Sequence, residues 1–399
     1  MKTVVVGMSG GVDSSVAALL LKQQGYRVIG LFMKNWEEKD ANGVCTSAQD
    51  YEDVARVCDR LSIPYYSIEF VQEYWDHVFA EFLRAYQAGY TPNPDILCNR
   101  EIKFNLFFKK ALEMGADYLA TGHYCRVGAP VGAGAASGTG HPAGAGFPPV
   151  AEAGFRLLKA VDTNKDQTYF VHTIRSEILS RVLFPIGHLT KPELRAIAEA
   201  HGLATAKKKD STGICFIGER NFRNFLSKYV PAKSGEIRTL SGERVGTHQG
   251  VAYYTLGQRK GLGLGGEGEA WFVVAKDVAR NILYVERGVL NPALYADELW
   301  ATELSWVAGN PPADEGRLFE CTAKARYRQP EQPCTVTCAG PGFPVHVQFH
   351  VPQRALTPGQ SVVFYSGDEC LGGGVIQRVG ATYRDQGKAL PEKVDLPQS

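Results

Sequence analysis

Two cysteines stand in surroundings that could activate a thiol. Cys98 lies in NPDILCNREIKF, close to a helix start predicted at residue 99, and Cys215 lies in KKKDSTGICFIGER. A helix N-terminus and neighbouring cationic side chains favour the thiolate, which is the nucleophilic form of cysteine. Asp95, three residues before Cys98, could act as an acid or base. The ordinary alternative for each thiol is a small buried apolar side chain.

The remaining cysteines give no such signal, and burial as small apolar side chains is the interpretation for them. They are Cys45, Cys58, Cys125, Cys321, Cys334, Cys338 and Cys370. A zinc site needs closely spaced ligand pairs, and only Cys334 and Cys338 come near, within β sequence. The cysteine number is odd and no CxxC occurs. This usage is typical of reduced thiols in the cytoplasm rather than a disulfide scaffold.

The stretch GMSGGVDS at residues 7–14 follows TVVV and precedes an apolar run. A strand, a glycine-rich turn and a helix N-terminus together favour an anion, and the serine hydroxyls add donors. Neither a Walker A lysine nor GxGxxG is present. Asp13 would repel a phosphate unless a metal lay between them, so Mg²⁺ is predicted there. The alternative is a tight turn with Asp13 as the N-cap.

The elements that must position these residues alternate in type. Strands are predicted at 2–7, 27–33, 64–70 and 117–123, and helices at 13–24, 51–61, 74–88 and 99–113. Such alternation implies a parallel sheet with helices on both faces. A Gly/Ala/Pro stretch at 128–154 is predicted to be a flexible insertion, because its composition cannot bury a core.

The second half of the chain changes character. A strand is predicted to resume at 155–162, and Thr190 with Glu193 predicts a capping box. A turn is predicted at residues 241–242 and a hairpin at 271–288. Short strands from 295 to 379 then predict a small β-barrel. Residues from about 381 onward are expected to be a frayed tail.

Composition limits the classes of function. The 399 residues are 44% hydrophobic with a formal net charge of +1, so any nucleic-acid contact must come from local patches. Candidate patches are the lysines 207–209 and the ARYR segment, whose ordinary alternative is a solvated strand edge. No stretch has the apolar length of a membrane span, and we do not expect the first residues to form a signal peptide. The expected location is therefore cytoplasmic.

Further motifs carry a resemblance to known families. SGGVDS resembles the loop of the N-type ATP pyrophosphatases, which cleave ATP between its α- and β-phosphates and adenylate an oxygen. A series of ten motifs, which together cover the chain from about residue 3 to 378, resembles the motifs of the bacterial tRNA-specific 2-thiouridylases (MnmA). Its members, in order, are GMSGGVDS, NWEE, TPNPDILCNREIKF, ATGHY, KDQTYF, AKKKDSTGICFIGER, TLGQRKGLG, ARYRQ, TPGQ and CLGGG.

The resemblance implies an architecture and an activity. We expect an α/β nucleotide-binding catalytic domain at 1–206, which includes the 128–154 insertion, a small mixed central domain at 207–290, and a C-terminal β-barrel at 291–380. Residues 381–399 are the tail. The implied enzyme is a sulfurtransferase that adenylates the C2 oxygen of a wobble uridine and replaces it with sulfur. Lys-, Glu- and Gln-type tRNAs and a persulfide donor or relay protein are the implied partners.

The resemblance also implies roles for individual residues. The implied ATP-binding residues are Gly7, Met8, Ser9, Gly10, Gly11, Val12, Asp13, Ser14, Met33 and Gly122. Cys98 is the implied nucleophile and Cys215 the persulfide carrier, and the two can close a disulfide when sulfur leaves. Residues around the flipped uridine are Asn93, Pro94 and Asp95, the last as acid or base. Further implied tRNA contacts are His123, Lys165, Asp166, Gln167, Arg326, Tyr327 and Gln360.

Two other classes of function compete with this interpretation. An ATP-pyrophosphatase ligase or amidotransferase acting on a small molecule would keep the fold, although no glutaminase-like stretch is visible. A tRNA-binding protein with a degenerate nucleotide site would keep the partner, although Asp13, Ser9, Ser14 and both thiols are present. His123 could equally be a hydrogen-bonded core histidine.

Overall fold

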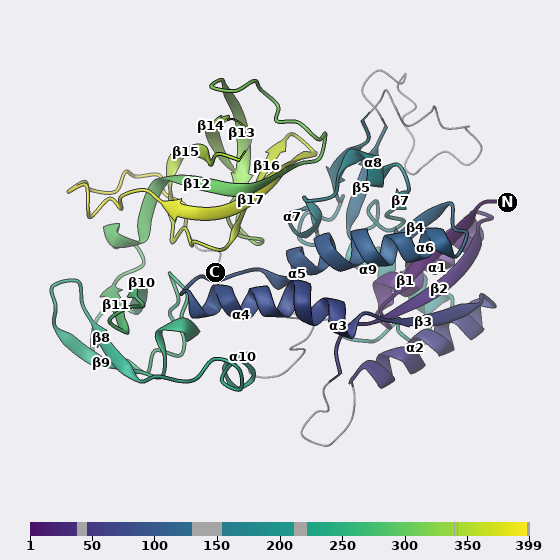
Figure 1. Cartoon of the computed structure of the whole chain (residues 1–399), viewed down its shortest axis with the longest axis horizontal. Coiled ribbons are helices and arrows are strands. Elements are labelled where there is room, and N and C mark those ends of the chain that lie inside the picture. The colour runs from purple at the N-terminus through teal and green to yellow at the C-terminus, as the bar shows by residue number, and fades with distance from the viewer. Residues whose placement is uncertain (38–45, 130–153, 211–221, 339, 341, 397–399) are drawn as a thin grey trace.

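The computed structural model describes residues 1–37, 46–129, 154–210, 222–338, 340 and 342–396. The described residues form three sheets, and Figure 1 shows the parallel sheet, the central sheet and the C-terminal barrel in different parts of the molecule. Within the described residues, no helix is long and apolar enough to cross a bilayer.

The N-terminal region is built on a five-stranded parallel sheet with strand order β3-β2-β1-β4-β7. Its strands are β1 (Thr3–Met8), β2 (Arg27–Lys34), β3 (Tyr65–Glu69), β4 (Tyr118–Thr121) and β7 (Val182–Leu183). Successive residues of β1 face opposite sides, so Val4 and Val6 join one core and Val5 the other. Helices cover both faces, and the predicted parallel sheet is confirmed.

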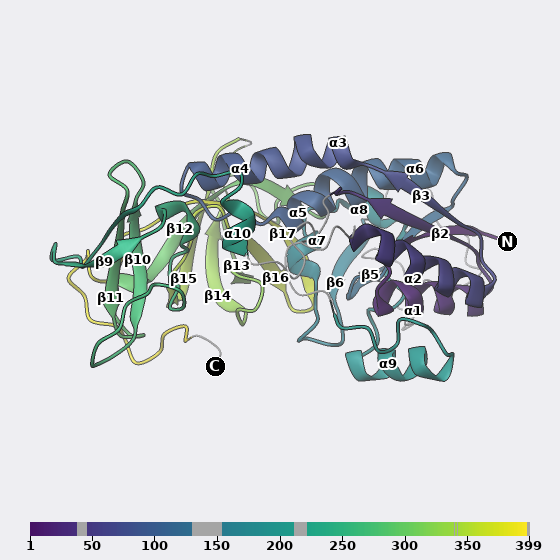
Figure 2. The same cartoon turned by 90° about the horizontal axis from the view of Figure 1, so that it is seen from below.

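One face of this sheet packs against α1 (Val12–Gln23), α2 (Thr46–Leu61) and α9 (Lys191–Ala200). The predicted capping box at Thr190 and Glu193 is present at the start of α9. The other face packs against α3 (Val71–Tyr74), the π-helical η1 (Trp75–Phe79) and α4 (Ala80–Gln87). In both views this helical run reaches from the parallel sheet toward the central region (Figures 1 and 2).

A second helical run completes that face. It consists of α5 (Pro94–Leu97), the π-helical η2 (Cys98–Phe107) and α6 (Phe108–Glu113), and the backbone leaves helical geometry at Phe104. The short helices α7 (Thr168–Val171) and α8 (Ser176–Leu179) follow later in the chain.

The central region is a four-stranded sheet with order β10-β11-β8-β9, preceded by α10 (Phe222–Leu226). The strands are β8 (Gly235–Arg238), β9 (Arg244–His248), β10 (Trp271–Asp277) and β11 (Ile282–Arg287). Gly242 has a φ of +97°, which supports the turn predicted at 241–242. The short 3₁₀ segment η3 (Val251–Tyr253) contacts α4.

The C-terminal region is a six-stranded antiparallel barrel, as predicted, closed by pairing of β12 with β17. The 3₁₀ segment η4 (Pro292–Leu294) precedes it. Its strands are β12 (Tyr295–Trp306), β13 (Leu318–Lys324), β14 (Gln332–Thr337), β15 (Val345–Arg354), β16 (Ser361–Ser366) and β17 (Glu369–Val379). The hairpin of β5 (Cys125–Gly128) and β6 (Arg156–Lys159), whose ends flank residues 130–153, extends this sheet from β17. The strand predicted at 155–162 therefore serves the barrel sheet and not the parallel one.

The expectation of a frayed tail is wrong for residues 381–396. Tyr383, Leu390 and Val394 pack against a cluster formed by the central region and the barrel. The backbone N–H of Asp395 donates to the carbonyl of Pro352 at 3.0 Å. Apolar residues spaced along an otherwise polar tail bury enough surface to order it.

Candidate active site

The turn between β1 and α1 has the form of an anion site. Gly11 caps α1 in an extended conformation and supplies no side-chain hydrogen bond, so this cap leaves the first-turn N–H groups of the helix available. Gly10 has a φ of +72°, which suits glycine. Ser14 Oγ lies 3.2 Å from both the backbone N and the Oγ of Ser9. Uncapped amides and serine hydroxyls at a helix N-terminus suit phosphate oxygens.

Two glycines allow close packing around this turn. A Cβ on Gly122 would lie 2.7 Å from the backbone N of Ser14 and 2.9 Å from the carbonyl carbon of Asp13. A Cβ on Gly10 would lie 2.6 Å from the carbonyl oxygen of Asp50. Backbone atoms cannot swing aside as a side chain can, so both positions require glycine. Gly122, expected at the ATP site, therefore contacts the start of α1.

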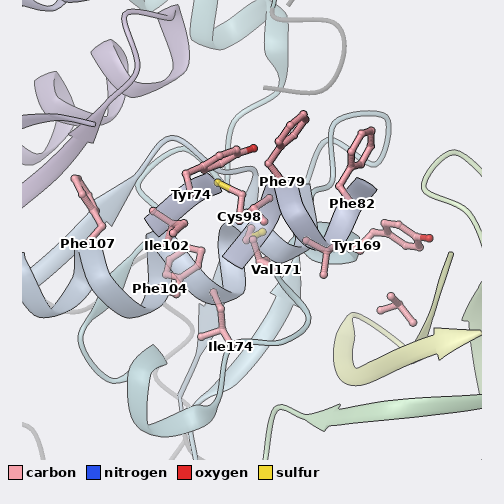
Figure 3. Packing of buried hydrophobic residues seen from close by; sticks show 14 of the residues in the cluster. Tyr74, Phe79, Phe82, Cys98, Ile102, Phe104, Phe107, Tyr169, Val171 and Ile174 are labelled. Atoms are coloured by element: carbon pink, nitrogen blue, oxygen red, sulfur yellow. The ribbon is translucent and has the colours of Figure 1, made fainter. Parts of the chain in front are cut away.

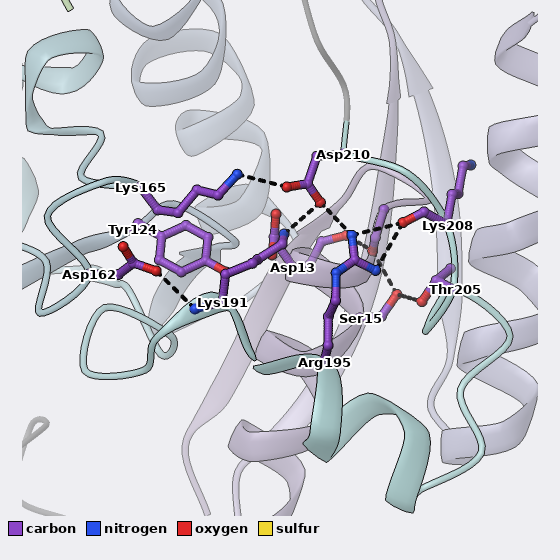
Figure 4. A network of polar contacts seen from close by, with 12 residues as sticks. Asp13, Ser15, Tyr124, Asp162, Lys165, Lys191, Arg195, Thr205, Lys208 and Asp210 are labelled. Carbon is purple, nitrogen blue, oxygen red and sulfur yellow. Dashed lines mark hydrogen bonds and ion pairs between the residues drawn. The ribbon is translucent and has the colours of Figure 1, made fainter. Parts of the chain in front are cut away.

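Asp13 lies in the first turn of α1 and is not its N-cap, because Gly11 holds that position. Its Oδ1 atom is 2.7 Å from Lys191 Nζ and accepts a hydrogen bond of 3.0 Å from the Tyr124 hydroxyl (Figure 4). Burial, and then the negative charge of Asp13, raise the pKa of Tyr124, so this phenol stays a donor. The acid of the loop is thus balanced by a cation from α9.

Asp210 extends this polar network. Its carboxylate pairs with Lys165 at 2.8 Å, with Lys191 at 2.9 Å and with Arg195 at 2.7 Å (Figure 4). Burial alone would raise the pKa of Asp210, but hydrogen bonds from Lys165 and Lys191 outweigh it and lower the pKa to about 2. Asp210 therefore holds three cations beside the turn and stays ionised.

The segment 165–167 is bonded into the same region. Asp166 is buried, and its two carboxylate oxygens accept from the Ala160 backbone N–H at 2.9 Å and the Thr168 hydroxyl at 2.6 Å. Burial, opposed by the Thr168 hydrogen bond, raises the pKa of Asp166. Gln167 accepts from the Tyr124 backbone N–H at 2.9 Å. These contacts order the segment predicted to meet tRNA and leave Asp166 covered.

The lysine patch at 207–209 also makes internal pairs. Lys208 Nζ is 2.8 Å from Asp50 Oδ1 and 2.6 Å from Asp53 Oδ2. Burial disfavours the charged amine, but the hydrogen bonds to these two carboxylates raise the pKa of Lys208. Lys208 therefore anchors its loop to α2, which corrects the expectation that the whole patch faces phosphates.

Cys98 does not lie at a helix start, so that expectation is wrong. The helix begins at Pro94, where proline at the first helical position needs no N–H partner. Asn93 is the N-cap, and its Oδ1 accepts from the Asp95 backbone N–H at 3.1 Å. Cys98 is consequently in the second turn. Asn93, Pro94 and Asp95, expected around the uridine, together form the helix start.

Cys98 is also buried, with 1% of its surface exposed. Figure 3 shows it among apolar side chains from α3, η1, η2 and α7, including Tyr74, Phe79, Ile102, Phe104, Phe107 and Val171. Arg100, expected to add positive potential, pairs with Glu101 at 2.7 Å and Glu303 at 3.3 Å. Within the described residues, the side chains that pack around Cys98 are therefore mainly apolar, and Arg100 is paired with carboxylates instead of adding positive potential at the thiol.

A polar residue that the sequence did not single out stands beside this thiol. Asn35 follows β2, is 7% exposed, and places Nδ2 4.0 Å from Cys98 Sγ. Asn99, 2% exposed, donates from Nδ2 to the Phe170 carbonyl at 2.9 Å. Within the described part of the chain, the Oδ1 atoms of Asn35 and Asn99 are buried without a hydrogen-bond partner. Such oxygens suit the N–H groups of a bound molecule.

The turn and the thiol are connected through packing. The Phe107 ring lies 3.2 Å from where a Gly7 Cβ would be, so η2 contacts β1 just before the turn. His123, directly after Gly122, lies 5.8 Å from the Phe104 ring and 2.8 Å, by Nδ1, from Thr121 Oγ1. Burial, and then Lys103, lower the pKa of His123, so it stays neutral. These contacts favour the packed-histidine alternative, and they connect the η2 helix, which carries Cys98, to the turn.

The residues predicted on the barrel lie at contacts between regions. Arg326 Nη2 donates to the Leu256 carbonyl at 3.2 Å, to Thr357 Oγ1 at 3.2 Å and to the Ala355 carbonyl. It therefore joins the central region to the barrel. The segment is not a simple solvated strand edge, although Arg328 in it is exposed.

Tyr327 and Gln360 join the barrel to the catalytic region. The Tyr327 ring lies 4.4 Å from the Phe170 ring, and Gln360 Nε2 donates to the Thr91 carbonyl. Met33, expected near the adenine, is half-buried on β2. The roles of these residues toward ATP and tRNA stay predictions.

Comparisons with known proteins agree with this arrangement. Family profiles described as a tRNA methyl transferase HUP domain, a tRNA methyl transferase PRC-barrel domain and an aminomethyltransferase beta-barrel domain match residues 2–219, 223–287 and 296–376. The tRNA-specific 2-thiouridylase MnmA of Protochlamydia amoebophila is 59% identical over 98% of both chains. The Bacillus subtilis protein of the same name is 54% identical over 96% of both chains.

The chain belongs to the tRNA-specific 2-thiouridylase family.

Some predicted thiouridylase residues lie outside the described residues. Cys215, the expected persulfide carrier, falls in 211–221, Cys45 in 38–45, and most of the insertion in 130–153. Of the other described cysteines, Cys321 is half-buried and the rest are buried, as the ordinary interpretation predicted. Among the described residues, no group of three or more His, Cys, Asp or Glu side chains is placed to hold a metal.

The sequence interpretation missed four residues of the site: Asn35, Tyr124, Lys191 and Asp210. Tyr124 ends the ATGHY motif, and Lys191 opens a helix that was predicted only by its cap. Lys191 meets Asp13 across 178 positions, so no local pattern could have paired them.

Proposed function

We propose that the chain is a tRNA 2-thiouridylase that adenylates the C2 oxygen of a wobble uridine and replaces it with sulfur. One observation carries this proposal: the anion-binding turn and the buried thiol share one packed unit, in which Phe107 contacts Gly7 and Phe104 contacts His123. The relatives named as thiouridylases support the same assignment. The reaction releases AMP and pyrophosphate.

ATP binds at the glycine turn. Its phosphates accept from the amides and hydroxyls of residues 7–14, and Gly122 and Met33 border the nucleoside. Asp13 would hold Mg²⁺ together with the phosphates of ATP, and the ion would supply positive charge that offsets phosphate charge there. Lys191 fixes the Asp13 side chain.

The target uridine must leave its stack before its C2 edge can be reached. Asn93, Pro94 and Asp95 receive the flipped base at the start of the Cys98 helix. Among the described residues, the Oδ1 atoms of Asn35 and Asn99 have no hydrogen-bond partner. Asn35 lies beside Cys98 and Asn99 follows it on the helix, and both oxygens can accept from a base N–H. Asp95 accepts the N3 proton as the C2 oxygen attacks the α-phosphate of ATP, and the bond to pyrophosphate breaks.

Sulfur transfer then proceeds in two steps that balance. The terminal sulfur of the Cys215 persulfide attacks C2 of the adenylated uridine, and the C2–O bond breaks with AMP as leaving group. The Cys98 thiolate next attacks Cys215 Sγ, so the persulfide S–S bond breaks and 2-thiouridine is released. A Cys98–Cys215 disulfide remains, and an external dithiol must reduce it. A persulfide donor or relay protein reloads Cys215.

The tRNA body is proposed to lie over Lys165 to Gln167, His123, Gln360 and the segment of Arg326 and Tyr327. Because Arg326, Asp166 and His123 are bonded or packed within the protein, they shape this surface, and exposed Arg328 is the direct phosphate contact. The expected substrates are tRNAs of the Lys, Glu and Gln type.

The test is mass spectrometry of tRNA nucleosides after incubation with ATP, Mg²⁺ and a persulfide donor, with pyrophosphate measured in parallel. We expect 2-thiouridine and tRNA-dependent pyrophosphate release. Pyrophosphate release driven by a small acid without tRNA would support the small-molecule ligase instead. A lack of ATP consumption would support a tRNA-binding protein.

A further inference from the structure

A pair of cysteines outside the active site faces each other across two barrel strands. Cys321 on β13 is directly opposite Cys334 on β14, and their Sγ atoms are 3.6 Å apart. Opposed residues of antiparallel strands have Cα atoms about 4.5–5.5 Å apart, which falls within the range that a disulfide bridges. Rotation of the two side chains alone could bring the sulfurs into bonding distance.

The two thiols differ in their access to solvent. Cys334 is fully buried beside Val336 in the barrel core, whereas Cys321 is half-buried at its margin. The hydrogen bond with Cys321, and then burial, raise the pKa of Cys334, so Cys334 is the less reactive partner. A small oxidant would therefore meet Cys321 first, with Cys334 already in place behind it.

The cysteine pair lies in a hairpin whose tip contacts the catalytic region. Cys321 and Cys334 face each other midway along this hairpin, whose tip, residues 325–331, carries Tyr327 and Arg328. Tyr327 contacts Phe170 of the catalytic region, and Arg328 is exposed. A covalent link between β13 and β14 would therefore fix the two strands that carry the segment that joins barrel and catalytic region.

We propose that Cys321 and Cys334 form a reversible redox pair that a small peroxide closes into a cross-strand disulfide. The Cys321 thiolate attacks the peroxide, the O–O bond breaks, and a sulfenic acid and one water form. Cys334 then attacks that sulfur, the S–O bond breaks, the S–S bond forms, and a second water leaves. The two thiols lose two electrons and two protons, which reduce one hydrogen peroxide to two waters. A dithiol reverses the step.

The test is peptide mapping of the folded full-length chain after hydrogen peroxide treatment and thiol blocking. Trypsin cuts after Lys324, Arg326 and Arg328, so the peptides of Cys321 and Cys334 stay together only through a disulfide. We expect a linked pair lighter by two hydrogens than the sum of the peptides, which dithiothreitol separates. Absence of this linked pair, with Cys321 only overoxidised or unmodified, would overturn the proposal.

Cys338 provides the matched control, because it shares a tryptic peptide with Cys334 and is also buried. The link should persist in Cys338→Ser and vanish in Cys334→Ser and Cys321→Ser. Persistence of the link in Cys334→Ser would assign it to Cys338 and contradict the cross-strand pair. Because the readout is a peptide and not activity, oxidation of the proposed catalytic thiols leaves the result unaffected.

Discussion

The two ends of the candidate site are built in opposite ways. At the turn after β1, charged side chains are paired with one another: Asp13 with Lys191, and Asp210 with three cations. At the other end Cys98 is 1% exposed and surrounded mainly by aromatic and aliphatic side chains. The polar end can bind a polyphosphate, and the apolar end can shield sulfur chemistry from water.

This difference suits a reaction whose two proposed steps need different local environments. Adenylation develops charge on phosphates and calls for fixed dipoles and cations. Sulfur transfer calls for a nucleophile kept from water and from stray oxidants. The predictions below separate these ends, beginning with the largest expected effect.

The Cys98→Ser change addresses the apolar end. It should lower 2-thiouridine formation by at least roughly a thousandfold, because it removes the proposed nucleophile. Single-turnover pyrophosphate release with tRNA should remain, since the turn is untouched. Nucleoside mass spectrometry and a pyrophosphate assay measure the two. Cys321→Ser is the control and should retain both; loss of pyrophosphate release in Cys98→Ser would show that the ends are not separable.

The Gly122→Ala change addresses the polar end. Its new Cβ would lie 2.7 Å from the Ser14 backbone N, so the start of α1 must shift. We expect ATP affinity, measured calorimetrically, to fall about 10- to 100-fold, in line with overpacking costs of about 1–3 kcal/mol. Gly265→Ala, where a Cβ meets no atom within 4 Å, should bind ATP normally. Unchanged ATP affinity in Gly122→Ala would contradict the assigned ATP site.

The Asn35→Ala change tests the polar contact to Cys98 at the apolar end. Hydrogen bonds to charged groups contribute about 1.5–3 kcal/mol, so loss of the Nδ2 donor should slow thiolation about tenfold or more. Single-turnover nucleoside mass spectrometry measures this rate. Asn105→Ala, on the helix that carries Cys98, is the control and should react at the native rate. A native rate in Asn35→Ala would contradict a role for Asn35 beside the thiol.

The smallest effect concerns stability at the polar end. The pKa of Asp210 is lowered to about 2 in the folded chain, against an ordinary 3.8. A depressed carboxyl pKa contributes stability above the ordinary value, and this contribution disappears as pH falls from about 4 toward 2. Urea unfolding of Asp210→Asn should therefore show a shallower loss of stability than the native chain in that interval. Equal slopes would contradict the proposed charge network.

The same two ends show what the sequence could predict. The turn was predictable because glycine, serine and a following apolar run are local signals, and so were the sheet, the barrel and the Thr190 capping box. Lys191 and Asp210 were missed because their partners come from distant segments. The surroundings of Cys98 were misjudged because Arg100 turns toward Glu303, 203 positions away, instead of the thiol.

The most direct test follows the C2 oxygen of the wobble uridine, which the proposed reaction adenylates and then replaces with sulfur. A tRNA carrying ¹⁸O at C2 of the wobble uridine would be incubated with the chain, ATP, Mg²⁺ and a persulfide donor. The account predicts that AMP gains one ¹⁸O for each 2-thiouridine formed. Formation of 2-thiouridine with unlabelled AMP would contradict adenylation of that oxygen.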